Sequence, residues 1–339
     1  MSTRAAQVEA TQKREISIID LLGRFAPLIF LLGLVAVLSY LEPGFRTERN
    51  IMNVLRQVSI IGILAVGMTF VILTAGIDLS VGSMVAFTGI VCAATAKGSR
   101  SLLAGGTTDP GGTRVLLAAL AAIGLGLAIG LFQGFLIGKL EIPAFVVTLG
   151  GLGAWRGATL VFSEGQPISG FSKDFKYWGQ GFIGRVPVPV VIFLLFVAVA
   201  FIILRYSQYG RWIYALGGNR EAARLSGLNT TALTISVYAI SGFCAGVGGF
   251  LLTSRLNSAE QVAGQNYELQ AIAAVVIGGT SLFGGVGGVI GTLIGTLLIG
   301  VLNNGLVILN VSPYWQPIVV AVILVSSVFF DQLAKKRRR

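Results

Sequence analysis

The sequence contains no histidine and only two cysteines in 339 residues. Without histidine, the chain lacks the commonest metal ligand and the side chain that most readily changes its charge near neutral pH. Cys92 and Cys244 both lie inside apolar segments, where a cysteine usually behaves as a small buried hydrophobe. The sequence therefore predicts no metal site, no disulfide and no histidine-based proton relay.

The sequence also lacks the motifs of catalysis and nucleotide binding. No G-x-x-x-x-G-K-S/T phosphate-binding loop occurs, and Gly138-Lys139 is followed by Leu140 without the required spacing. Nucleophilic triads and chains of acidic residues through the apolar segments are missing as well. We therefore expect no enzymatic activity, no ATP hydrolysis and no cofactor in this chain.

Charged residues are scarce, because they make up 12% of the chain against about 25% in a typical soluble domain. Hydrophobic residues make up 54%, and the mean hydropathy is +0.83. Such a chain cannot cover its whole surface with polar groups, so we expect lipid to surround it. No polar stretch is long enough to form a second globular core, which predicts a single membrane domain.

Basic residues exceed acidic ones, which gives a net charge of +11. A positive excess of this size raises nucleic acid as a partner. The basic residues, however, lie at the chain ends and between apolar segments, with a cluster at 335–339. This distribution is typical of the cytoplasmic faces of membrane proteins, so we expect contact with lipid and none with nucleic acid.

Ten apolar segments are predicted to be membrane helices within one domain, residues 25–331. Most of them are close to the length of about 20 residues that a helix needs to cross a bilayer. No small-residue cleavage signature follows the first segment, which predicts an uncleaved span after a polar tail at 1–24. We expect an interfacial segment at 42–57, a loop at 163–187 and a basic cytoplasmic tail at 332–339. The ten segments are 25–41, 58–75, 81–96, 115–137, 143–162, 187–204, 232–253, 271–279, 291–309 and 317–330.

The segment 271–279 leaves two topologies open. It is too short to cross a bilayer comfortably, and a cluster of glycines interrupts the stretch after it. If it is re-entrant, there are nine spans and the basic cluster at 335–339 is exported, which the positive-inside tendency disfavours. Ten spans with a cytoplasmic N-terminus place 14 of the 25 Lys and Arg residues inside and 10 outside, with Arg156 in the membrane. We therefore expect an all-α polytopic protein of about ten transmembrane helices, some broken or re-entrant, with both termini cytoplasmic; the three arginines of 42–57 do not fit this tendency.

Four collinear stretches resemble a known family. They are ILTAGIDLSVGS (72–83), IPAFVVTLGGLGAWRG (142–157), YALGGNREAARLSGLN (214–229) and YELQAIAAVVIGGTSLFGGVGGVIGTLIG (267–295). Together they resemble the membrane permease subunits of ABC-type sugar importers, the group that carries ribose, xylose, arabinose and galactose. The resemblance covers about residues 45–331 of the chain.

This resemblance implies a permease of the bacterial inner membrane that translocates a monosaccharide, ribose-like or another pentose or hexose. It implies a separate ATPase subunit, which would bind ATP and Mg, at the cytoplasmic loops. It also implies a periplasmic sugar-binding protein and a second permease copy, as a homodimer or a close pair. The permease itself would need only weak contacts with the solute.

The cytoplasmic loop at 205–231 contains a short predicted helix. Asn219 is a suitable N-cap, Glu221 favours the positive end of a helix, and Gly227 is a suitable stop. The residues alone allow an ordinary amphipathic connector whose two alanines are free for close contact. The Glu-Ala-Ala, three residues, Gly spacing is similar to the motif by which binding-protein-dependent permeases dock on their ATPases. This similarity implies a coupling set of Asn219, Arg220, Glu221, Ala222, Ala223 and Gly227.

Asp78 and Ser80 lie in a polar turn between the second and third segments. Either side chain could accept a hydrogen bond from the free amides at the start of the third helix. Because a carboxylate in a membrane is costly unless it is paired, capped or wetted, a structural cap and a polar lining of the solute path remain alternatives. The sequence Gly279–Leu282 weakly resembles Gly76–Leu79 of this turn and also lies in a Gly-flanked break. Helix breaks at corresponding positions in the two halves of a transporter often mark its binding region.

Other polar residues in the apolar segments could also line a path. Arg156 should face the bundle interior or water, although it could instead snorkel toward the outer headgroups or pair with Glu164. Uncharged side chains suit the hydroxyls of a neutral sugar, but they could equally hold neighbouring helices together. The uncharged candidates are Thr280, Ser281, Asn303 and Asn304.

Two other classes of function remain as alternatives. An ion-coupled secondary transporter or facilitator would work alone and would use Asp78 or Arg156 for coupling. A membrane-embedded enzyme would need catalytic side chains that the sequence does not contain. The Glu-Ala-Ala loop and the scarcity of acids within apolar segments favour the importer subunit.

Overall fold

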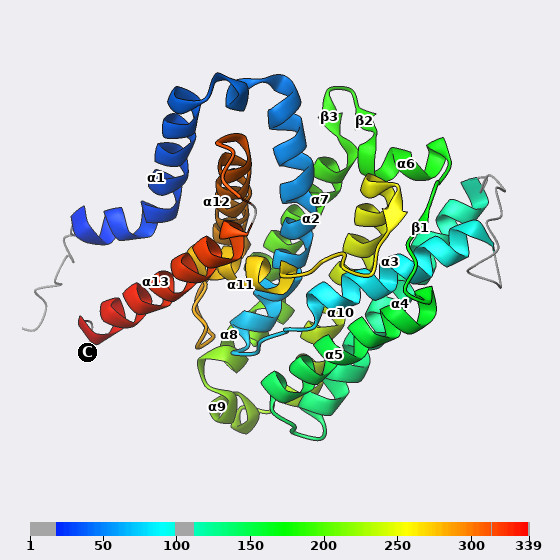
Figure 1. Ribbon diagram of the computed structural model, residues 1–339. Coiled ribbons are helices and arrows are strands. Elements are labelled where there is room, and N and C mark those ends of the chain that lie inside the picture. Colours follow the sequence, from blue (N-terminus) through cyan, green and yellow to red (C-terminus); the bar gives the residue numbers. More distant parts are fainter. Residues whose placement is uncertain (1–17, 99–111, 313, 338–339) are drawn as a thin grey trace, which may run out of the picture.

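The computed structural model describes residues 18–98, 112–312 and 314–337. Within these residues the chain is an assembly of helices with four strands of two residues each (Figure 1), so the predicted all-α class is confirmed. The tails predicted at 1–24 and 332–339 lie partly outside the described residues, as does most of the loop between the third and fourth segments.

The helices follow the predicted apolar segments closely. In chain order they are α1 Ile18–Leu41, the short 3-10 helix η1 Pro43–Arg46, α2 Glu48–Leu73, α3 Val81–Lys97, α4 Gly112–Gly138, α5 Ala144–Ser163, α6 Lys173–Gln180, α7 Val188–Tyr206, α8 Gln208–Gly218, α9 Arg220–Leu225, α10 Thr230–Leu256, α11 Tyr267–Ile277, α12 Val289–Ile308 and α13 Trp315–Arg337. The strands form two antiparallel pairs, β1 Ile168–Ser169 with β4 Ser258–Ala259, and β2 Phe182–Ile183 with β3 Val186–Pro187.

All ten predicted segments are helical. In the described chain, six helices are long and apolar enough to cross a membrane, namely α2, α4, α5, α7, α10 and α12. The other four segments contain shorter apolar helices, of which α11 is the shortest at 11 residues. At about 1.5 Å per residue, α11 reaches roughly half of a hydrocarbon core about 30 Å thick. Any crossing at this point must therefore be completed by the turn after α11.

Three predicted connections are more helical than the sequence indicated. Most of the expected interfacial segment 42–57 forms the first turns of α2, which begins at Glu48 and is capped by the side chain of Thr47. The expected loop at 163–187 contains α6, whose Phe175 side chain is fully buried. The cytoplasmic loop predicted at 205–231 contains α8 before the predicted short helix. All three helices depend on contacts that hydropathy does not report.

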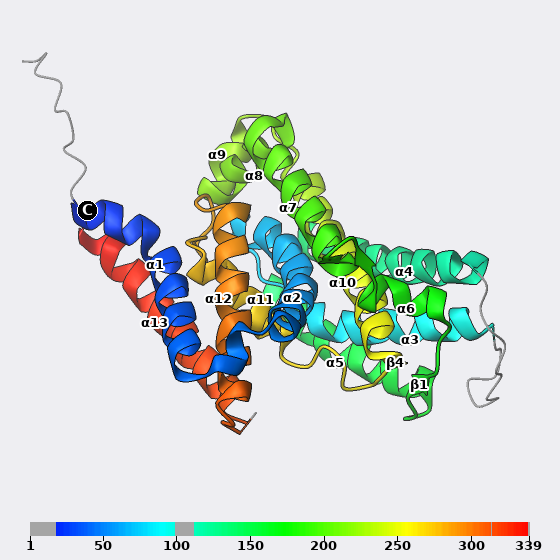
Figure 2. The same ribbon diagram turned by 90° about the horizontal axis from the view of Figure 1, so that it is seen from above.

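The helices α2 and α10 form the buried centre of the molecule. Glycine allows α10 and α4 to approach closely, because a Cβ at Gly242 would lie 2.1 Å from the carbonyl oxygen of Gly126. Such contact is how helices pack in lipid, where no hydrophobic force draws apolar surfaces together. α1 and α13 lie at one edge of the molecule, away from α4 and α5 (Figure 2).

The connections between helices gather in two groups. In one group, the Gly285 N–H donates to the Leu73 carbonyl oxygen at 3.0 Å, which joins the turn after α11 to the end of α2. In the other, Arg56 Nη2 donates to the Gln180 carbonyl oxygen at 2.9 Å, and β1 pairs with β4. Figure 2 shows α9, the start of α1 and the end of α13 toward the upper left of the molecule. The strands β1 and β4 lie toward the lower right.

Candidate functional site

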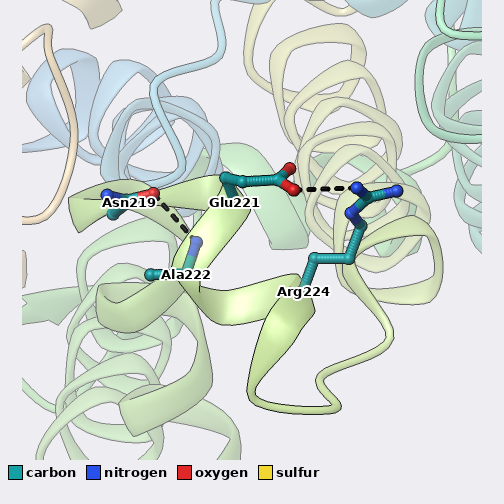
Figure 3. A network of polar contacts seen from close by, with 4 residues as sticks. All are labelled: Asn219, Glu221, Ala222 and Arg224. Atoms are coloured by element: carbon teal, nitrogen blue, oxygen red, sulfur yellow. Dashed lines mark hydrogen bonds and ion pairs between the residues drawn. The ribbon is translucent and has the colours of Figure 1, made fainter.

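The short helix α9 stands between α8 and α10 at one end of the molecule (Figures 1 and 3). Asn219 caps it, because its Oδ1 accepts a hydrogen bond from the Ala222 N–H at 2.9 Å. Gly227 follows its last turn at φ +83° and donates its N–H to the Arg224 carbonyl oxygen at 3.0 Å. The predicted start and stop of this helix are therefore confirmed.

The outer face of α9 carries an ion pair. Arg224 Nη2 lies 2.8 Å from Glu221 Oε1, and both side chains are about two-thirds exposed (Figure 3). The hydrogen bond and the charge of Glu221 raise the pKa of the Arg224 guanidinium above its usual value. An exposed pair such as this one contributes little to stability, so its presence does not explain the helix. Both charges remain accessible to a partner.

One expectation about α9 is wrong. Ala222 is exposed, but Ala223 is only 4% exposed and packs against its own chain, so it is not free for close contact with a partner. Instead, Leu225 presents a side chain that is 77% exposed. Hydropathy alone could not identify Leu225, because a leucine in a six-residue helix is usually the one that faces inward.

The predicted pathway residues Asp78 and Ser80 are fully buried and bonded to each other. Asp78 Oδ1 accepts from the Ser80 N–H at 3.0 Å and from Ser80 Oγ at 2.7 Å. Asp78 Oδ2 accepts from Ser241 Oγ of α10 at 2.7 Å, and Ser80 Oγ also bonds with Gln133 of α4. The structure thus supports a structural role, but neither side chain accepts a hydrogen bond from an amide of α3 itself. Instead, the carboxylate ties Ser80, the residue before α3, to α10. Sequence reasoning missed Ser241 and Gln133, although each is a polar residue within an apolar helix.

Arg156 contacts backbone groups. Its Nη1 donates to the carbonyl oxygens of Gln261 and of Ala263, the latter at 2.9 Å. These two residues precede α11, so Arg156 fastens that segment to α5. The predicted alternative partner, Glu164, is exposed just beyond the end of α5.

Thr280 and Ser281 are buried in the turn between α11 and α12. Thr280 Oγ1 accepts from the Gly288 N–H at 3.3 Å, and Ser281 Oγ accepts from the Phe283 N–H at 3.2 Å. Thr280 also lines a small cavity of about 50 Å³ that reaches Val328 of α13. The two hydroxyls therefore fix the turn in this structure.

The two predicted asparagines of α12 join helices. Asn304 exchanges two hydrogen bonds of 2.9 Å with Asn50 of α2. Asn303 Nδ2 donates to Gln270 Oε1 of α11 at 3.2 Å, whereas Asn303 Oδ1 is buried without a hydrogen-bond partner among the described residues. Of the seven candidate pathway residues, Asp78 and Ser80 are hydrogen-bonded to each other. The role of the seven in lining a path stays a prediction.

No group of three metal-ligating side chains is found in the part of the chain that the structure describes. A polytopic all-α chain that displays a short capped helix at one end has the build of a membrane transport permease. Residues 50–328 match the family described as the branched-chain amino acid transport system / permease component, and the chain belongs to this family.

Curated relatives cover nearly the whole chain. It is 46% identical to the ribose import permease protein RbsC of Escherichia coli K12 over 308 residues, 90% of this chain and 92% of the relative. It is 40% identical to the RbsC protein of Bacillus subtilis 168, over 97% of this chain and 98% of the relative. The D-allose transport system permease protein AlsC of Escherichia coli K12 is 37% identical, over 98% and 99%. No solved structure matches.

The predicted resemblance to ABC-type sugar permeases is thereby confirmed. The chain is a transport subunit and not an enzyme, and it is a multi-pass protein of the bacterial inner membrane. The alternative of a membrane-embedded enzyme is excluded by this membership.

Proposed function

We propose that the chain translocates a monosaccharide, ribose-like or another pentose or hexose, as the permease subunit of an ATP-driven importer. The observation that carries this proposal is the near full-length similarity to permeases named for ribose and D-allose import. A separate ATPase would bind ATP and Mg, and a periplasmic binding protein would deliver the sugar. A second copy of the permease would complete the path across the membrane.

The helix α9 is the proposed docking point for the ATPase. It is capped at both ends, so its shape is defined before a partner binds, and it offers Glu221, Arg224 and Leu225 on its surface. An exposed apolar side chain beside charged groups is a usual arrangement for a protein interface. The helix would be shaped, or the contact bordered, by Asn219, Arg220 and Gly227. The buried Ala223 would pack α9 against the rest of the chain.

The proposed topology has ten crossings, with α9 and both termini in the cytoplasm. The two groups of connections support it, since loops that ten crossings would place on one side contact one another. The start of α1 and the end of α13 also lie toward the same side as α9 (Figure 2). An ion-coupled transporter receives no comparable support, because Asp78 already has three hydrogen-bond donors within the chain.

Glu221→Gln tests the docking of the ATPase. The variant keeps the size of the side chain but removes its charge, and because the Glu221–Arg224 pair is exposed, the fold should be unaffected. We expect sugar uptake by the complete importer to fall roughly tenfold, as does co-purification of the ATPase with the permease.

Glu164→Gln is the matched control, since Glu164 is an exposed carboxylate in the opposite group of connections. This control should import sugar at the rate of the unaltered importer. Normal uptake and normal ATPase retention by Glu221→Gln would refute the docking role of α9.

A further inference from the structure

The ends of α2 and α8 and the turn between α11 and α12 meet at one point. The Gly285 N–H donates to the Leu73 carbonyl oxygen at 3.0 Å. Gly217 of α8 lies against both groups, because a Cβ there would be 1.8 Å from the Leu73 oxygen and 2.6 Å from the Gly285 nitrogen. Three backbones therefore touch directly, with no side chain between them.

The turn after α11 has a shape that only glycine adopts without strain. Gly284 and Gly285 have φ angles of +81° and +72°. A Cβ at Gly284 would lie 2.7 Å from the Gly217 carbonyl oxygen. In addition, Tyr214 Oη of α8 donates to the Gly287 carbonyl oxygen at 2.9 Å. The helix α8 thus contacts this turn at two separate points along its last turn.

This meeting point is directly connected to the docking helix. Gly217 lies two residues before Asn219, the cap of α9, so only one residue connects α8 to α9. On the other side, Leu73 ends α2 and leads into the turn that carries the buried Asp78. Direct contact between backbones leaves little freedom for one element to move without displacing the other, because packed interiors are dense and have few voids.

We propose that the junction of Leu73, Gly217 and Gly285 transmits movement of α9 to the two helix pairs whose connecting turns lie beside it, α2–α3 and α11–α12. Gly217 acts here as a positioning residue, because only a residue without a Cβ lets the α8 end contact both neighbours. This inference rests on the proposed function, in which an ATPase displaces α9. It adds the point at which that displacement would reach the transmembrane helices.

Gly217→Ala and Gly218→Ala form a matched pair of variants for testing the junction. The two glycines are adjacent in α8, but a Cβ at Gly218 would meet no atom of the described chain within 4 Å apart from its chain neighbours and the backbone of its own helix. The importer would be reconstituted with its ATPase and binding protein, and the measured quantity would be the number of sugar molecules imported per ATP hydrolysed. We expect this ratio to fall roughly tenfold in Gly217→Ala, with ATP hydrolysis and assembly retained, and to be unchanged in Gly218→Ala.

A ratio in Gly217→Ala equal to that of the unaltered importer would overturn the proposal. If this variant does not assemble, Tyr214→Phe decides, because it removes the bond to Gly287 without adding bulk. A reduced sugar-to-ATP ratio in Tyr214→Phe supports the junction, and an unchanged ratio refutes it. Absence of ATP-driven uptake in the unaltered importer would instead refute the proposed function, and this inference would fall with it.

Discussion

At the residue scale, Asp78 shows how a charge is kept in the interior of this protein. Its carboxylate accepts hydrogen bonds from the backbone and side chain of Ser80 and from Ser241 of α10. A buried charge is tolerated only when such partners surround it. Asp78 therefore holds the start of α3 to α10 in this structure.

Asp78→Ala should destabilise the protein. Three buried donors would lose this acceptor. The Ser80 hydroxyl can still donate to Gln133 Oε1, whereas each donor left unsatisfied costs roughly 1–3 kcal/mol. Ser241→Ala removes one donor together with its need for a partner, so it should cost less. Thermal unfolding in detergent should show a lower midpoint for Asp78→Ala than for Ser241→Ala. Equal stability of Asp78→Ala and the unaltered protein would contradict this role.

Residue-level prediction from the sequence succeeded where the interaction is local. Asn219 and Gly227 act within a few residues of their own position, so their types and spacing were enough to predict a cap and a stop. The partner of Asp78 on α10 could not be predicted, because Ser241 lies 163 residues further along the chain. The burial of Ala223 depends on tertiary packing for the same reason.

At the element scale, hydropathy located every apolar helix but not the amphipathic helices α6 and α8. Long apolar runs become helices in lipid because no other arrangement of a single segment satisfies the backbone. α6 has no such run, and it is held by contacts such as the bond from the Gly179 N–H to Ser254 Oγ at 2.7 Å. A helix of this length depends on tertiary packing, which the sequence does not display.

The six-residue helix α9 should depend on its cap. Asn219→Ala removes the bond to the Ala222 N–H and should cost about 1 kcal/mol of local stability, whereas Asn219→Ser keeps a capping oxygen. Hydrogen exchange at Ala222 should be faster in Asn219→Ala than in Asn219→Ser, and uptake should fall only in the former. Identical exchange and uptake in the two variants would show that the cap does not shape the docking helix.

At the scale of the whole molecule, the two opposite ends of the helical assembly contain different elements. One end combines α9, the end of α2 and the glycine-rich turn before α12, whereas the other contains α6 and the two small strand pairs. The sequence predicted this division through the placement of its polar loops. The contact between Leu73 and Gly285 could not be predicted, since it joins backbones more than 200 residues apart and involves no distinctive side chain.

The central claim is that the chain is a passive gate which a separate ATPase drives through α9. The most direct test is accumulation of labelled ribose in vesicles, with the permease alone or together with its ATPase, its binding protein and ATP. Uphill accumulation of ribose should occur only in the complete system. Sustained uphill accumulation by the permease alone would contradict this claim.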